Sequence, residues 1–249
     1  MHFPANISVG NTTIPIHFLC ETLAYAVGYR YYSYLRKHQH DSISDHNRII
    51  IFIGAAIGAF LGSHLLGVLE QPTKILYMNW MYIMANTTII GGLLGGLIGV
   101  ELTKKQIGVT ASSGDLMVYP IMVSMLIGRT GCFLAGLTDG TFGIASNLPW
   151  AINFGDGVYR HPTNLYEMLF WLTLWFALYQ LERKHELVNG ARFKLLMVSY
   201  LLFRLCIEFI KPAYFLNFGL SVLQLASLAG LAYYYKVILY PTRNFKAYA

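Results

Sequence analysis

The sequence predicts an all-α protein, a polytopic bundle of about seven transmembrane helices. Three observations carry this prediction: an apolar composition, apolar runs of near-spanning length along the whole chain, and an uneven distribution of lysine and arginine. Of the 249 residues, 55% are hydrophobic and 12% are charged, whereas soluble proteins carry about 25% charged residues. This composition argues against a soluble domain, and no linker divides the chain, so we expect one membrane-embedded domain over 1–249.

Seven apolar runs are long enough to cross the roughly 30 Å of hydrocarbon in a bilayer as helices. In chain order they are 16–35, 49–68, 82–102, 116–136, 164–181, 194–210 and 215–236. The third is the least regular, because Asn86, Thr87 and Thr88 lie inside it. Basic residues follow the first run and do not precede it, so we interpret it as a span and not as a cleavable signal.

Lysine and arginine set the predicted orientation. Twelve lie in the connections after spans 1, 3, 5 and 7, namely Arg36, Lys37, Arg48, Lys104, Lys105, Arg183, Lys184, Arg192, Lys194, Lys236, Arg243 and Lys246; three, Lys74, Arg160 and Lys211, lie on the other side. Cytoplasmic connections carry the excess of these residues, which puts the N-terminus outside and the C-terminus in the cytoplasm. The net charge of +6 indicates contact with anionic lipid, and the absence of a separate basic cluster argues against nucleic acid.

Glycine recurs every four residues in the second and third spans, at 54, 58 and 62 and at 91, 95 and 99. Such stripes allow close packing of helix backbones, and a groove for a lipid chain is the alternative. The longest predicted loop, 137–163, contains the turn signals Asp139-Gly140 and Asp156-Gly157. Its apolar residues argue against disorder, so we expect a cap on the outer side of the membrane.

Two arginines inside predicted spans are the first candidate functional residues, since a charge at membrane depth requires an anionic partner. Arg129 has no acidic residue four positions away, which favours a ligand anion; the alternative is a tertiary partner such as Glu21, His64 or Asp139. Arg204 and Glu208 lie four residues apart on one helix face. They form an internal ion pair, or Arg204 binds a phosphate while Glu208 orients it.

His161 and Glu167 are a candidate acid–base pair, since either type transfers protons when burial shifts its pKa; a helix cap and a rim carboxylate are the alternative. His64 stands alone on an apolar face and is either a satisfied interior group or a base. The chain contains no G-x-S-x-G, H-E-x-x-H, P-loop or dinucleotide motif, which argues against those hydrolases, zinc proteases and nucleotide enzymes. The three cysteines form no C-x-x-C pair, so we expect no metal or organic cofactor.

Two segments resemble the bacterial prolipoprotein diacylglyceryl transferase family, whose signature reads G-R-x-G-N-F-x-N-x-E-x-x-G, followed later by R-H-P-[ST]-Q-L-Y-E. The matching positions are Gly128, Arg129, Gly131, Phe133, Gly136 and Gly140 for the first, and Arg160, His161, Pro162, Thr163, Leu165, Tyr166 and Glu167 for the second. The stretch 203–209 resembles the family's F-R-x-x-x-E-F segment, 95–100 matches GGLIGV, and Gln224 stands where the family has a glutamine in its last span.

The chain departs from the family pattern at several polar positions. Cys132 and Ala135 replace the two asparagines and Leu137 replaces the glutamate, while Asp139 supplies an acid two residues further on. Leu94 stands in place of a family histidine, and His64 in place of a family arginine. These changes leave the two phosphate-binding arginines, Arg129 and Arg204, in place and leave the acceptor substrate open.

The resemblance implies a multi-pass enzyme of the bacterial inner membrane. It would transfer the diacylglyceryl group of phosphatidylglycerol to the cysteine thiol of a prolipoprotein, whose signal peptide would be a partner. Arg129 and Arg204 would hold the phosphate, His161 or His64 would accept the thiol proton, and Glu167 or Asp139 would orient the base. The further expected substrate-binding residues are Glu208, Gly140, Arg160, Tyr166 and Gln224. A paralogue with another acceptor, or a non-catalytic lipid binder or transporter, is the alternative.

Overall fold

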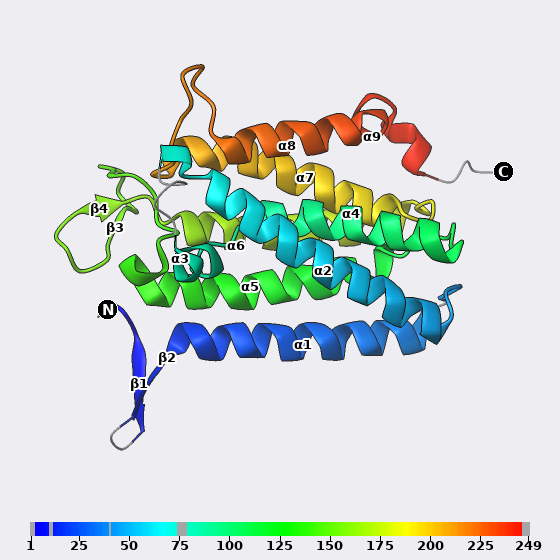
Figure 1. Cartoon of the computed structure of the whole chain (residues 1–249), viewed down its shortest axis with the longest axis horizontal. Helices are drawn as coiled ribbons and strands as arrows, with labels where there is room; N and C mark the ends of the chain where they lie inside the picture. Colours follow the sequence, from blue (N-terminus) through cyan, green and yellow to red (C-terminus); the bar gives the residue numbers. More distant parts are fainter. Residues whose placement is uncertain (1–2, 10–11, 40, 74–78, 246–249) are drawn as a thin grey trace.

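The computed structural model describes residues 3–9, 12–39, 41–73 and 79–245, and it is mostly helical. Long helices run side by side along the long axis of the molecule (Figure 1). They are α1 (Ile16–His38), α2 (Asp45–Leu69), α4 (Ile89–Ile107), α5 (Val118–Ala135), α6 (Thr163–Lys184), α7 (Ala191–Ile207) and α8 (Val222–Tyr233). Each overlaps one of the seven predicted apolar runs.

The third predicted span is interrupted, which corrects the sequence prediction of one helix over 82–102. The short helix α3 (Trp80–Ala85) ends before Asn86, and α4 begins only after Thr88. The Thr88 side chain accepts a hydrogen bond from the backbone N–H of Gly91, so this threonine caps the new helix. The polar residues inside the run therefore end one helix and start the next.

The last predicted span is also shorter as a helix than the run 215–236. Its helix α8 begins at Val222, after a capping box in which Ser221 and Gln224 exchange hydrogen bonds, and α9 (Tyr235–Leu239) follows it. The sixth span, predicted over 194–210, ends in the 3₁₀ turn η4 (Glu208–Ile210) directly after α7. Other 3₁₀ turns are η2 (Asp115–Met117), η3 (Gly136–Asp139) and η5 (Pro241–Asn244).

Two small antiparallel hairpins lie outside the all-α description. Strands β1 (Asn6–Val9) and β2 (Thr12–Pro15) immediately precede α1 in the chain and pair with Asn6 opposite Pro15. Strands β3 (Ile152–Asn153) and β4 (Tyr159–Arg160) pair within the predicted outer loop. Both hairpins lie near the same end of the bundle, which is also the end of α5 and the start of α6 (Figure 1).

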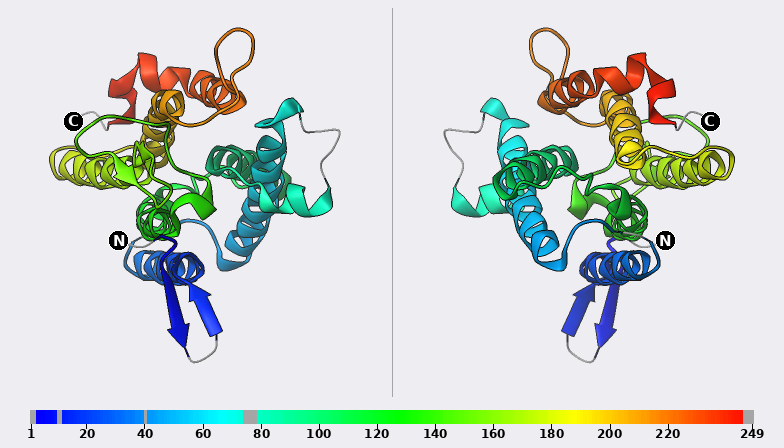
Figure 2. Two further views of the ribbon diagram at one scale, coloured as in Figure 1. Left: turned by 90° about the vertical axis from the view of Figure 1, so that its left-hand side faces the viewer. Right: turned by 90° about the vertical axis from the view of Figure 1, so that its right-hand side faces the viewer.

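The helices form a main bundle and a separate pair. Viewed along the bundle, α2 and α4 stand to one side of the other helices (Figure 2). The predicted close packing of the glycine stripes is confirmed in this pair: a Cβ added to Gly58 would lie 2.2 Å from the carbonyl oxygen of Gly95. In the main bundle Trp171, Tyr200 and Met122 belong to the buried hydrophobic core.

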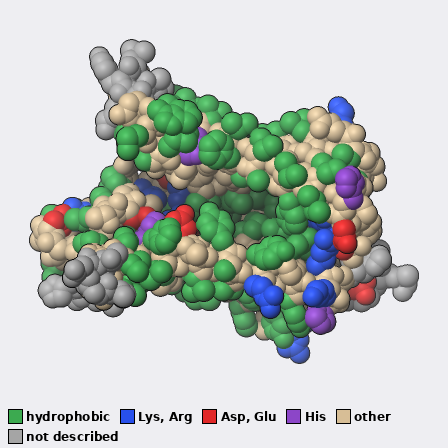
Figure 3. Space-filling model, turned by 60° about the horizontal axis from the view of Figure 1, so that its bottom comes forward, with side chains coloured by type: hydrophobic (Ala, Val, Ile, Leu, Met, Phe, Trp, Pro, Cys, Tyr) green, Lys and Arg blue, Asp and Glu red, His purple; other side chains and the backbone are tan. Residues whose placement is uncertain are grey.

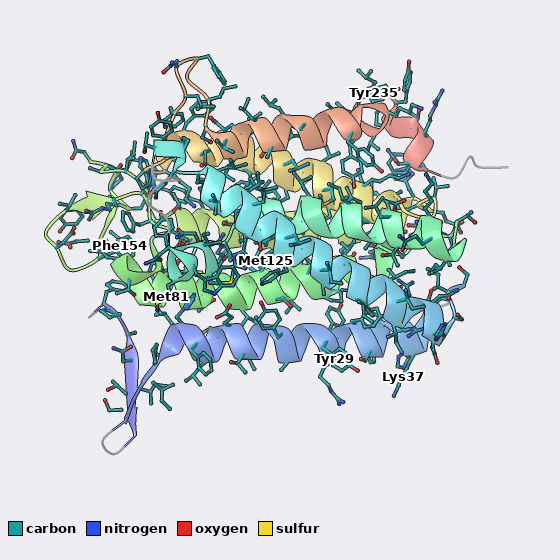
Figure 4. The ribbon with its side chains drawn as sticks, viewed as in Figure 1. Tyr29, Lys37, Met81, Met125, Phe154 and Tyr235 are labelled. Atoms are coloured by element: carbon teal, nitrogen blue, oxygen red, sulfur yellow. The ribbon has the colours of Figure 1, made fainter. Side chains whose placement is uncertain are left out.

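The outer surface of the helices is apolar. Large side chains of α2 are more than half exposed, namely Ile49, Ile53, Ile57, Phe60, Leu61 and Leu65. Tyr29 of α1 points away from the bundle (Figure 4). Hydrophobic side chains dominate the middle of the face seen in Figure 3, which is hollowed there. Exposed apolar surface of this extent marks contact with lipid or with another protein.

Two helical stretches in the described residues, Asp45–Leu69 and Asp115–Asp139, are long and apolar enough by length and composition to cross a membrane. Helix α8 is apolar as well but shorter. The remaining helices carry more charged or polar residues or are shorter. The structure therefore supports a helical protein with apolar helices.

Candidate active site

Arg129 lies near the C-terminal end of α5, and its side chain points into the bundle, where 5% of the residue is exposed. Its Nε lies 2.9 Å from Oε2 of Glu167, in the second turn of α6. The sequence suggested Glu21, His64 or Asp139 as the tertiary partner of this arginine; the ion pair with Glu167 corrects that expectation. Burial of Glu167, 3% exposed, also excludes a carboxylate at the protein rim.

Glu167 also connects Arg129 to the second buried arginine. Its Oε2 lies 3.9 Å from Nη1 of Arg204, and its Oε1 accepts a hydrogen bond of 3.0 Å from the hydroxyl of Tyr200. A single carboxylate therefore lies between two guanidinium groups that come from α5 and α7. This arrangement holds two positive charges close together, which only a shared anion makes tolerable at such burial.

The predicted contact between Arg204 and Glu208 is confirmed. Arg204 donates from Nη2 to Oε2 of Glu208 over 3.1 Å, and the two side chains are almost completely buried. The other carboxylate oxygen of Glu208 accepts a hydrogen bond from Ser221, the residue that caps α8. Gln224, predicted to bind substrate, uses its side chain to cap the same helix and to donate to the Leu205 carbonyl.

Arg204 keeps unused hydrogen-bonding capacity. Among the described residues, its Nε is a buried donor without a hydrogen-bond partner, whereas Nε of Arg129 lies in the ion pair with Glu167. Buried polar groups are normally satisfied, so a donor of this kind suits an additional acceptor. With Glu167 and Glu208, the four side chains carry no net charge, and we refer to them below as the arginine cluster.

Lys211, immediately after η4, is a residue that sequence reasoning counted only as a loop charge. Burial, together with the positive charges of Arg204 and Arg129, lowers its pKa to about 8. Burial, and then the negative charge of Glu208, raise the pKa of Glu70, which follows α2. Lys211 is therefore a third positive charge next to the arginine cluster, since its backbone N–H donates to the carbonyl oxygen of Glu208 over 3.2 Å. Its position after the predicted span gave no sign of this.

Asp139, predicted to replace a lost acid of the family pattern, meets two residues that the sequence did not connect with it. Its Oδ1 lies 3.1 Å from Nε2 of His17 in the first turn of α1. The same nitrogen lies 3.7 Å from Sγ of Cys132 on α5, and Cys132 in turn lies 3.6 Å from Nη1 of Arg129. This group of His17, Cys132 and Asp139 therefore adjoins the arginine cluster.

The predicted acid–base pair of His161 and Glu167 is not brought together as the sequence suggested. Nδ1 of His161 lies 3.2 Å from the hydroxyl of Tyr166, and that hydroxyl also accepts a hydrogen bond from the Trp150 indole over 2.7 Å. Glu167 points instead toward Arg129. Tyr166, which precedes Glu167 in the chain, faces the outer loop, because it stands on another side of α6.

Arg160 is held within the outer loop. Two of its guanidinium nitrogens donate to the carboxylate oxygens of Asp156, each over 2.7 Å, and these bonds lower the pKa of Asp156 to about 2. The guanidinium also lies over the ring of Phe142. This predicted substrate-binding residue is thus engaged with its own loop.

The structure places Gly140 at the end of a turn and His64 beside a neighbouring helix. Gly140 has a φ of 69° and ends η3, a conformation that glycine adopts readily. Nδ1 of His64, on α2, lies 3.0 Å from the carbonyl oxygen of Ile83, in α3. The structure therefore connects His64 to the short helix α3.

Buried arginines paired with carboxylates between apolar helices are typical of proteins that bind anionic groups in or at a membrane.

The family model of prolipoprotein diacylglyceryl transferases matches residues 4–240. Three relatives bear the name phosphatidylglycerol–prolipoprotein diacylglyceryl transferase. The protein of Wolbachia pipientis subsp. Culex pipiens is 29% identical over 90% of this chain and 89% of its own length. That of a Nostoc species is 28% identical over 92% and 86%, and that of Methylobacillus flagellatus 32% over 71% and 69%.

The chain belongs to the prolipoprotein diacylglyceryl transferase family. The expectation drawn from its two motifs is therefore confirmed, and with it the assignment to a family of transferases. The first motif supplies Arg129, and the second supplies Glu167, which meet in one ion pair.

Proposed function

We propose that this protein transfers the diacylglyceryl group of phosphatidylglycerol to the cysteine thiol of a prolipoprotein. The observation that carries the proposal is the arginine cluster, in which Arg129 and Arg204 are each 5% exposed and Arg204 keeps an unbonded Nε donor. Planar guanidinium groups bind phosphate oxygens in pairs. The relatives named above act, by their names, on phosphatidylglycerol and prolipoprotein.

In the proposed reaction the thiolate sulfur attacks the glycerol carbon that carries the phosphate. A carbon–sulfur bond forms, the bond between that carbon and the phosphate oxygen breaks, and glycerol phosphate leaves with the electron pair. The departing phosphate thereby changes from a monoanion to a dianion, and the proton of the thiol is released separately when the thiolate forms. Arg129 and Arg204 stabilise the charge that develops, with Lys211 as a third cation at the edge.

The surroundings of the predicted base residues favour positioning roles for several of them. His161 and Tyr166 fix the outer loop against α6 through the Trp150 hydrogen bond. Gln224 and Glu208 hold the start of α8 against the end of α7. These contacts keep the arginine cluster in place, and we propose the same supporting role for Arg160 and Gly140 in the loop.

We further propose seven spans in the bacterial inner membrane, with the N-terminus outside. Basic residues support this orientation: the ends of α1, α4 and α6 and the starts of α2, α5 and α7 lie at one end of the bundle (Figure 1). Helix α4 ends in Lys104 and Lys105, and α6 ends in Arg183 and Lys184. The arginine cluster lies toward the opposite end, under the outer loop, where a secreted precursor is accessible.

A cysteine introduced at Ser146 should then react with a membrane-impermeant reagent in intact spheroplasts, whereas one at Asn189 should not. The two positions lie at opposite ends of the bundle, in the outer loop and between α6 and α7. Labelling at both positions, or the reverse pattern, would overturn the orientation.

The reaction itself is tested with purified protein, phosphatidylglycerol and a peptide that contains a lipoprotein cysteine motif. We expect release of glycerol phosphate only when the peptide is present, and none with the same peptide carrying serine in place of cysteine. A paralogous transferase with another acceptor is the second candidate, favoured by Cys132, Ala135 and Leu137 at the altered signature positions. Release that depends on a different acceptor would support it, and no release with any acceptor would indicate a lipid binder.

A further inference from the structure

His17, Cys132 and Asp139, whose side chains are of types that can bind metal ions, come together from three separate elements. Gly131 explains the approach of α1 to α5, because a Cβ at this position would lie 2.7 Å from the Cβ of Cys20 and 3.3 Å from the Cα of His17. The missing side chain lets His17 lie beside Cys132. The turn η3 then carries Asp139 back to the same point.

The spacing of the three ligand atoms fits a tetrahedral metal ion. Nε2 of His17 lies 3.1 Å from Oδ1 of Asp139 and 3.7 Å from Sγ of Cys132, and all three atoms lie within 4.8 Å of one another. Zinc bonds to nitrogen, oxygen and sulfur measure about 2.0–2.3 Å, which places neighbouring ligands of a tetrahedron about 3.3–3.7 Å apart. An ion would therefore fit with small movements of the side chains.

The surroundings of the group support ligation. Thr141 donates to Oδ2 of Asp139, so the second carboxylate oxygen is held while Oδ1 faces His17; partners of this kind orient ligands in metal sites. The Asp139 side chain is 10% exposed and that of His17 is 36% exposed, which leaves an entry path on the side of the histidine. A thiolate and a carboxylate together balance a divalent cation.

From these observations we infer that His17, Cys132 and Asp139 bind a zinc-class divalent ion with an open fourth position, which takes the acceptor cysteine as a thiolate. The inference rests on the proposed transferase function. Three protein ligands and one open position are the pattern of catalytic zinc sites, and a thiol that coordinates such an ion loses its proton. The three ligands adjoin Arg129, because Sγ of Cys132 contacts both Nη1 of Arg129 and Nε2 of His17.

The ion would supply a means of activating the thiol. Coordination replaces the thiol proton, which leaves to water, and the metal-bound sulfur then attacks the glycerol carbon. The carbon–oxygen bond breaks, glycerol phosphate departs with the electron pair beside Arg129 and Arg204, and the thioether product dissociates from the ion. The metal keeps its oxidation state throughout, so no oxidant or reductant is needed.

Cobalt(II) titration of the purified, chelator-treated protein tests the site without reference to activity. We expect one ion per chain and a thiolate-to-cobalt charge-transfer band, which Cys132→Ser abolishes and His17→Gln weakens strongly. Thr141→Val should weaken binding about 10–100-fold, the usual effect of removing a partner of a metal ligand. The matched controls Cys206→Ser and His38→Gln should bind as the unaltered protein does.

Adding the acceptor peptide to the cobalt protein separates this inference from the proposed function. We expect the charge-transfer band to grow as a second thiolate joins the ion, and we expect chelation to abolish glycerol phosphate release and zinc to restore it. Full transferase activity after chelation, with no cobalt band, would overturn the metal site and leave the transferase function standing. A cobalt band that the peptide leaves unchanged would overturn the thiol-activating role, and a cobalt band in Cys132→Ser would overturn the ligand set.

Discussion

Replacement of Glu167 by glutamine tests the arginine cluster most directly. The substitution keeps the shape of the side chain but removes the negative charge that lies 2.9 Å from Arg129 and 3.9 Å from Arg204. Glu208 then remains the single carboxylate for two buried guanidinium groups. Leaving one charge uncompensated at such burial costs about 3–5 kcal/mol, which corresponds to a fall of roughly 6–20 °C in Tm for a chain of this size.

An anion that binds between the arginines should reverse part of this loss. In the unaltered protein a phosphate enters a cluster that is already neutral, whereas in Glu167→Gln it replaces the missing charge. We therefore expect glycerol phosphate to raise the Tm of the variant more than that of the unaltered protein. A ligand present at a hundred times its Kd raises the free energy of unfolding by about 2.7 kcal/mol, which is comparable with the loss expected for the variant.

The assay is thermal unfolding in detergent, with and without glycerol phosphate, on matched preparations. Asp156→Asn serves as a control, because it removes a carboxylate whose pair with Arg160 is exposed to solvent and contributes little. A Tm for Glu167→Gln equal to that of the control, or equal gains from glycerol phosphate in the variant and the unaltered protein, would refute the reasoning.

Three further predictions concern the same site. Arg129→Lys should be nearly as inactive as Arg129→Ala in the peptide assay, because one lost charge-assisted hydrogen bond of about 1.5–3 kcal/mol slows turnover roughly 10–150-fold; retention of most activity would mean that charge alone suffices. Arg204→Leu combined with Glu208→Met should yield folded but inactive protein, whereas recovered activity would reduce this pair to scaffolding. Affinity for phosphatidylglycerol should fall as the pH rises through about 8, where Lys211 loses its proton, and Lys211→Met should remove this inflection.

The sequence predicted those parts of the site that depend on spacing along one helix. Arg204 and Glu208 are four residues apart, and helical geometry alone placed them together. The partner of Arg129 could not be found in this way, because Glu167 lies on a different helix and its contact depends on how α5 packs against α6. His17 gave no signal at all, since a single histidine at the start of an apolar run has many possible surroundings.

The fold was predictable to a similar degree. Apolar runs located the long helices, but the breaks at Asn86–Thr88 and before Val222 depend on capping by Thr88 and Ser221, which compete with continuation of the helix. The first hairpin carried a local signal in its alternating, β-branched residues around Gly10-Asn11; those two residues lie outside the described ones.

Because the backbones of α2 and α4 are in contact, some positions of this helix pair tolerate substitution during evolution and others do not. At Gly58 and Gly95 even a methyl group would meet a carbonyl oxygen 2.2 Å away, so exchange for any other residue separates the helices. Gly92, where the nearest atom to an added Cβ is 3.9 Å away, accepts alanine. The exposed positions of α2 require only that a side chain be apolar. Among distant relatives we therefore expect this pair to keep its glycine register while its outward faces drift freely, so that overall identity understates how strictly the backbone is retained.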